Sequence, residues 1–103
     1  MIVAFSVAPG TADADGSVHD AVAAAVRVVR DSGLPNRTSS MFTEIEGEWD
    51  EVMEVVKRAT EAVGQFSPRV SLVLKADIRP GHTGEINGKI ERLEKALEND
   101  APA

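Results

Sequence analysis

Apolar and polar side chains alternate along three stretches of the chain, with the period of two that is typical of β-strands. The three stretches are residues 1–8, 42–46 and 70–79. The two faces of the middle stretch are Thr43 with Ile45, and Phe42 with Glu44 and Glu46. A glycine or a Pro-Gly pair follows each stretch, so we predict three strands that each bury one face.

A fourth strand is predicted over residues 36–40, which are polar and follow Pro35. Proline and polar side chains are tolerated at the edge of a sheet, so this stretch is expected to be an edge strand. A tight turn near Ser40 and Met41 separates it from the strand over residues 42–46. The two strands are therefore predicted to form a hairpin.

Apolar side chains recur at helical spacing in three further stretches, which begin near Ser17, Glu48 and Thr83. The expected buried stripes are Val18, Val22, Ala25, Val26 and Val29 in the first helix, Trp49, Val52, Met53, Val56, Ala59 and Val63 in the second, and Ile86, Ile90, Leu93 and Leu97 in the third. Gly33 is expected to end the first helix. At this spacing Trp49 is expected to be a core anchor, with stacking on a ligand ring as the alternative.

The predicted order of elements is β-α-β-β-α-β-α, and the first six match the split βαβ, ferredoxin-like plan. We therefore predict an α+β fold with a four-stranded antiparallel sheet, two helices on one face and a C-terminal helix. Residues 1–98 form one domain in this prediction, and residues 99–103 form a frayed tail. The uncovered sheet face would expose Phe42 and Val73, so a homodimer or homotetramer is expected.

Charge and composition exclude several classes of partner. The chain of 103 residues has a formal net charge of −6, which counts against nucleic acid and leaves room for a cationic ligand. It has no cysteine, which excludes disulfides and thiolate chemistry and favours a cytoplasmic location. Its longest apolar runs are too short to cross a bilayer, so no membrane partner is expected.

No metal or cofactor is expected. His19 and His82 have no metal-ligand spacing around them. The segment Asp13-x-Asp15-Gly16 lacks the later ligands of a calcium loop, and is expected to be a solvated loop.

Glu44 and Glu46 are the candidates for catalysis, because they lie two residues apart on one strand face. Such paired carboxylates can do acid–base work. A solvated or salt-bridged pair is the more frequent role, so no catalytic residue is assigned and the chain is not expected to be an enzyme.

A distinctive stretch surrounds the predicted corner between the third strand and the second helix: Met41-Phe42-Thr43-Glu44-Ile45-Glu46-Gly47-Glu48-Trp49-Asp50-Glu51-Val52. It resembles the signature of the small thiamine-binding protein family, which reads roughly Met-x-Thr-x-Ile-Glu-Gly-x-x-Asp-Glu-Val. The likeness extends to residues 1–9, 26–34 and 75–79, and so covers nearly the whole chain.

The resemblance implies a βαββαβ domain that assembles as a dimer or a dimer of dimers and binds thiamine or its hydroxymethylpyrimidine moiety. The ligand-binding residues that it implies are Ser6, Thr38, Ser40, Phe42, Thr43 and Glu46. Thiamine carries a cationic thiazolium and an aminopyrimidine, which suit an aromatic wall, a carboxylate and hydroxyls. The expected function is therefore a non-catalytic, cytosolic binding protein. A small oligomeric enzyme or metabolite sensor on the same scaffold is the alternative.

Overall fold

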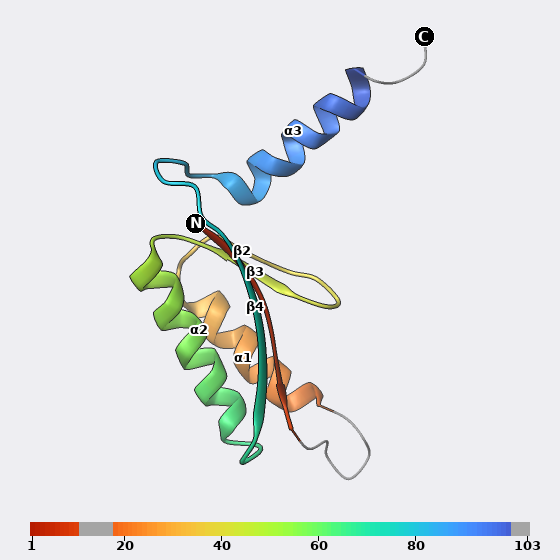
Figure 1. Cartoon of the computed structure of the whole chain (residues 1–103). Coiled ribbons are helices and arrows are strands. Elements are labelled where there is room, and N and C mark those ends of the chain that lie inside the picture. Colours follow the sequence, from red (N-terminus) through yellow and green to blue (C-terminus); the bar gives the residue numbers. More distant parts are fainter. Residues whose placement is uncertain (11–17, 100–103) are drawn as a thin grey trace.

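The computed structural model of the chain describes residues 1–10 and 18–99 (Figure 1). Seven elements follow one another in the predicted order: β1 (Ile2–Pro9), α1 (His19–Asp31), β2 (Asn36–Thr38), β3 (Thr43–Glu46), α2 (Trp49–Gly64), β4 (Val70–Asp77) and α3 (Glu85–Asn99). The Asp13-x-Asp15-Gly16 segment, the expected helix start at Ser17 and residues 100–103 of the expected tail lie outside the described residues. Asn99, which the sequence pattern assigns to the tail, is the last residue of α3.

The four strands form one antiparallel sheet in the order β2-β3-β1-β4. β1 is a central strand, and its Val3 lies between Ile45 of β3 and Ala76 of β4. Figure 1 shows α1 and α2 side by side on one face of this sheet. The predicted ferredoxin-like α+β fold is therefore confirmed, with α3 added after the βαββαβ unit.

The core lies between this sheet face and the two helices. From the sheet, Val3, Phe5 and Ile45 are fully or almost fully buried. The helices contribute only valines and alanines, whose small side chains let α1 and α2 lie close to the sheet. These helix residues are Ala21, Ala25, Val29, Val52, Val55, Val56, Ala59 and Val63.

The ends of α1 and α2 follow from local chemistry. Gly33 has a φ of +80°, a conformation that only glycine adopts without cost, and it stops α1 as predicted. At the start of α2, Glu48 and Glu51 form a capping box, in which the Glu48 N–H donates to Glu51 Oε1 over 3.2 Å.

The prediction that Trp49 is a core anchor is wrong, because Trp49 is 55% exposed. Trp49 is the first residue of α2 and lies at the margin of the buried stripe. Val52, one turn further along, is the first fully buried position of the helix. Val55, which the predicted stripe omitted, is also buried.

The hairpin turn is longer than the sequence pattern predicts. β2 ends at Thr38 and β3 begins at Thr43, so residues 39–42 form a loop. Within it, the Ser39 N–H donates to the Phe42 carbonyl over 2.9 Å, and the Phe42 N–H donates to Ser39 Oγ over 3.2 Å. These bonds satisfy backbone groups that a strand would pair. They place Phe42 in the loop rather than on the sheet face, where the alternation predicted it.

The second sheet face, opposite α1 and α2, is called the open face here. Its residues on β1, β3 and β4 include Ile2, Ala4, Glu44, Val73 and Lys75. Figure 1 shows α3 leaving the sheet at the end where β1 begins and pointing away from the rest of the molecule. Burial in α3 is confined to its first two residues, Glu85 and Ile86.

Candidate ligand-binding site

β1 is longer than β3, and this difference opens one side of the sheet. Pairing between β1 and β3 stops at Phe5 and Thr43, whereas pairing between β1 and β4 continues to Pro9. Within the described chain, residues 6–8 therefore have strand partners on the β4 side only. Backbone groups of a strand that lack a ladder partner are ready hydrogen-bonding groups for another molecule.

A pocket of about 310 Å³ occupies this opening, and we call it the hairpin pocket. Its lining comes from β1 (Phe5, Ser6, Val7, Ala8), from the start of α1 (Val18, Val22, Ala25, Val26) and from residues 38–43 of the hairpin. Val22 is 36% exposed because α1 overhangs the pocket here. The volume lies at the lower end of the range of about 300–1,000 Å³ that small-molecule sites have.

Five of the six residues that the family resemblance implies for the ligand line the hairpin pocket: Ser6, Thr38, Ser40, Phe42 and Thr43. They bring hydroxyl groups and one aromatic ring to a single place from β1, β2, the hairpin loop and β3. The apolar wall opposite, Val22 and Val26, was assigned to the core by its helical spacing. Periodicity cannot distinguish a buried stripe from one that faces an open pocket.

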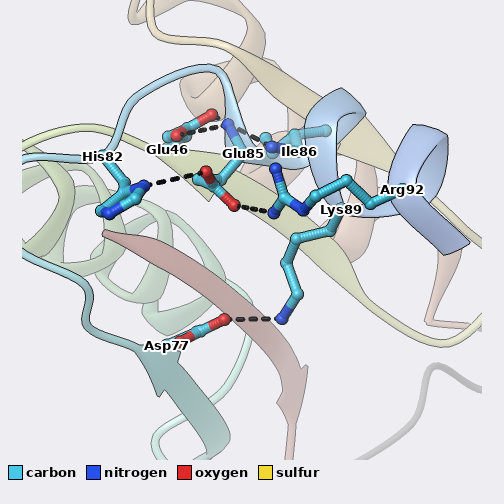
Figure 2. Close-up of polar contacts among 7 residues, drawn as sticks. All are labelled: Glu46, Asp77, His82, Glu85, Ile86, Lys89 and Arg92. Atoms are coloured by element: carbon cyan, nitrogen blue, oxygen red, sulfur yellow. Dashed lines mark hydrogen bonds and ion pairs between the residues drawn. The ribbon is translucent and has the colours of Figure 1, made fainter.

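Glu46, the sixth of these residues, lies at the other end of β3 and outside the hairpin pocket. Its side chain is buried and faces the first turn of α3 (Figure 2). The Glu85 N–H donates to Oε2 over 2.8 Å, and the Ile86 N–H donates to Oε1 over 3.2 Å. These N–H groups have no partner within the helix, and the helix dipole favours a negative charge there. Glu46 therefore anchors the base of α3.

Two ion pairs reinforce this anchor (Figure 2). Arg92 donates to Glu85 Oε2 over 2.5 Å, and this hydrogen bond holds the pKa of Glu85 below its ordinary value. Lys89 donates to Asp77 Oδ2 over 2.6 Å, and this bond lowers the pKa of Asp77. His82 Nδ1 lies 3.6 Å from Glu85 Oε1. Sequence spacing pointed to none of these contacts. The Lys89–Asp77 pair joins α3 to β4, His82 lies in the loop before α3, and Arg92 and Glu85 lie about two turns apart within α3.

The described residues were also searched for a metal site and for a membrane-spanning helix. They hold no group of three or more His, Cys, Asp or Glu side chains that could bind a metal ion. Among residues 1–10 and 18–99, no helix is long and apolar enough to span a membrane. The candidate pair Glu44 and Glu46 is divided in its roles, since Glu46 is buried against α3 and Glu44 remains partly exposed on the open face.

The fold and the hairpin pocket define a small ferredoxin-like domain with a ligand-sized opening beside its central strand. A family model described as "Thiamine-binding protein" matches residues 3–94. The chain therefore belongs to the thiamine-binding protein family, as its signature stretch predicted.

Relatives and solved structures agree with this assignment. A UPF0045 protein of Mycobacterium tuberculosis is 52% identical over 99 residues, which cover 94% of each chain. A domain of unknown function DUF77 from Bacillus cereus has a TM-score of 0.77 at 33% identity, covering 88% of this chain and 86% of that one. A Thermotoga maritima structure, named as a candidate thiamine biosynthesis/salvage protein, has a TM-score of 0.73 at 28% identity and covers 88% and 97%.

Proposed function

We propose that this protein is a non-catalytic, cytosolic binding protein for thiamine or its hydroxymethylpyrimidine moiety, and that the ligand occupies the hairpin pocket. The observation that carries the proposal is the gathering of five predicted ligand residues around one opening. The family to which the chain belongs supports the choice of ligand. A neighbour named for thiamine biosynthesis or salvage supports it further.

The chemistry of the pocket suits the two rings of thiamine. An aminopyrimidine presents hydrogen-bond donors and acceptors along its edge, which the hydroxyls of Ser6, Thr38 and Ser40 and the unpaired side of β1 can meet. The Phe42 ring and the valines of α1 offer apolar surfaces for stacking and for the cationic thiazolium. A net charge of −6 also favours the approach of a cation.

Glu46 enters this proposal separately from the other five residues. Both of its carboxylate oxygens accept hydrogen bonds from α3, at the opposite end of β3 from the pocket. We therefore assign direct ligand contact to the pocket residues and keep a ligand role for Glu46 as a prediction that its own replacement tests.

Binding is tested by calorimetry and thermal shift with thiamine and with hydroxymethylpyrimidine. A ligand that binds only the folded state raises the melting temperature by mass action. Phe42→Ala should weaken binding about tenfold, because a ring that stacks on a ligand cation contributes roughly 0.5–2 kcal/mol. Phe66→Ala is the matched control, since Phe66 is a half-exposed phenylalanine outside the hairpin pocket.

The outcome separates the two candidate functions. No heat and no stabilisation at millimolar concentration of either compound would contradict the proposal and favour a small oligomeric enzyme or metabolite sensor. Equal losses of affinity in Phe42→Ala and Phe66→Ala would leave thiamine binding established but would contradict the hairpin pocket as its site.

The proposal includes a homodimer or homotetramer. The support is exposed apolar surface on the open face and on α3, in particular Val73, Leu93 and Leu97, each more than half exposed. Exposed apolar surface of this kind is usually covered by a partner.

A further inference from the structure

The hairpin pocket is lined by uncharged side chains. Among the described residues that line it, the polar ones are serines and threonines, and none is Asp, Glu, Lys, Arg or His. The α3 end of the molecule is the reverse. A small cavity of about 40 Å³ there has six ionisable side chains in its lining: Asp77, Arg79, His82, Glu85, Lys89 and Arg92. The pocket can therefore form hydrogen bonds, but its lining offers no ion pair.

The basic side chains of the elements around the pocket are directed elsewhere. Arg37 of β2 is next to Thr38 of the pocket wall, but its Nη2 donates to Asn87 Oδ1 of α3 over 2.8 Å. The basic residues of α1 are exposed and lie outside the pocket lining: His19, Arg27 and Arg30. The strand pairing and the helix spacing that form the pocket thus keep these cations out of it.

The start of α1 and the net charge also act against an added anion. The first turn of a helix attracts negative charge, and Asp20 already supplies a carboxylate to the first turn of α1. The chain has a formal net charge of −6, which repels an anion as it approaches. A neutral or cationic ligand meets neither obstacle.

A phosphate ester is therefore poorly suited to the hairpin pocket. It carries a charge of about −1.5 to −2 at pH 7 on three acceptor oxygens. Taking this charge out of water without a cationic partner is strongly unfavourable. A free alcohol group carries no charge, and it needs only hydrogen-bond partners of the kind that serine and threonine hydroxyls provide.

We propose that the hairpin pocket selects the free alcohol of its ligand and rejects the phosphate ester, so that it binds thiamine or hydroxymethylpyrimidine but not their phosphorylated forms. The selection comes from the uncharged lining. The protein then holds the form that a phosphotransferase consumes and a phosphatase releases. This inference rests on the ligand proposed above and narrows it to compounds without a phosphate.

Competition calorimetry tests the selection at this pocket. Thiamine is titrated into protein with and without thiamine monophosphate, and hydroxymethylpyrimidine is titrated in the same way against its phosphate ester. An ester that binds only at the basic α3 end does not occupy the pocket, so displacement of the alcohol is the quantity that decides. We expect each ester to compete at least about tenfold more weakly than its alcohol.

The outcomes of this experiment separate the two proposals. Competition by the ester as strong as that by the alcohol would overturn the selection and leave the proposed function standing. Binding of neither alcohol would contradict the proposed function, and the selection with it.

A charge added at the rim of the pocket supplies the second measurement. Met41 lines the pocket and is 74% exposed, so a lysine of similar length fits at this position. Met41→Lys should narrow the ratio of alcohol to ester affinity about two- to fivefold, which is the size of an exposed ion pair. Met41→Gln is the matched control, because it is polar and of similar length but uncharged, and it should keep the wild-type ratio. Equal ratios in the two variants would overturn the uncharged lining as the cause of the selection.

Discussion

The hairpin pocket and the base of α3 lie at opposite ends of the same short strand. β3 has four residues, with Thr43 in the pocket at one end and Glu46 under α3 at the other. Their Cα atoms are separated by three residue steps, or about 10 Å. The two regions nevertheless differ in how they are held together, and the difference determines what each can be used for.

The pocket exists because elements fail to meet. β3 stops short of the end of β1, the loop over residues 39–42 bonds to itself, and α1 continues over the gap. The hairpin part of its lining, residues 38–42, is exposed, so a ligand can reach it from solvent.

The base of α3 shows the reverse arrangement. The Glu46 carboxylate is shielded from solvent, both of its oxygens are used, and Glu85 beside it is buried with an arginine partner. Such a fully paired cluster fixes a geometry and leaves no group for a ligand. The region without satisfied contacts is therefore the candidate for binding, and the region with them is the candidate for positioning α3.

The largest expected effect that tests this comparison comes from Glu46→Ala. Two N–H groups at the base of α3 would lose their acceptor, at about 1–3 kcal/mol for each buried group. We expect hydrogen exchange of the α3 amides to accelerate strongly, while amides of α1 and β1 stay protected. Glu44→Ala, on the same strand but partly exposed, should leave α3 unchanged.

Ligand affinity in Glu46→Gln decides the role of Glu46. If it only anchors α3, thiamine affinity should change less than twofold in Glu46→Gln. A loss of about tenfold or more, with α3 still protected, would show that the carboxylate faces the ligand, because a lost charge-assisted bond costs roughly 1.5–3 kcal/mol.

Elements with a local sequence signal could be predicted. The hairpin pocket depends on such signals more than the base of α3 does. Strand alternation, helical stripes and Gly33 all act within a few residues, so the order of elements follows from them. The pocket residues were named through a family signature, most of it contiguous around β3. The anchor joins Glu46 to a residue 39 positions further along, and nothing near either residue indicates the contact.

The failed predictions have the same origin. Alternation places Phe42 in a strand, but the Ser39 side chain satisfies the backbone of the turn and removes Phe42 from the sheet. Helical spacing includes Trp49 in the stripe, but it carries no information on where α2 meets the sheet edge. For Phe42 a local hydrogen bond outweighs the strand periodicity, and for Trp49 the position at the end of α2 outweighs the helical periodicity.

A smaller effect should appear on acidification, and in one region only. The folded pKa values of Asp77 and Glu85 are lowered by Lys89 and Arg92, so their contribution to stability is present at neutral pH and is lost as the pH falls through those values. NMR shifts of amides at the base of α3 should therefore change on acidification only below the pH at which an ordinary aspartate or glutamate titrates. Combining Lys89→Met with Arg92→Met removes both partners and should reduce this acid dependence. An unchanged profile would mean that other groups hold α3.

The smallest expected effect tests whether the two regions communicate. Arg37 of β2 donates to Asn87 Oδ1 over 2.8 Å, and it is next to Thr38 in the pocket wall, so it links the hairpin to α3. The bond is exposed, so we expect it to contribute near the lower end of the range of about 0.5–1.5 kcal/mol that hydrogen bonds contribute. Arg37→Met keeps much of the side-chain length and removes the bond, so thiamine affinity should change by less than about twofold. Arg30→Met, an exposed arginine in the last turn of α1, is the control. A change of fivefold or more specific to Arg37→Met would contradict the separation of the two regions, because a bond this weak can alter binding only by shifting the hairpin together with α3.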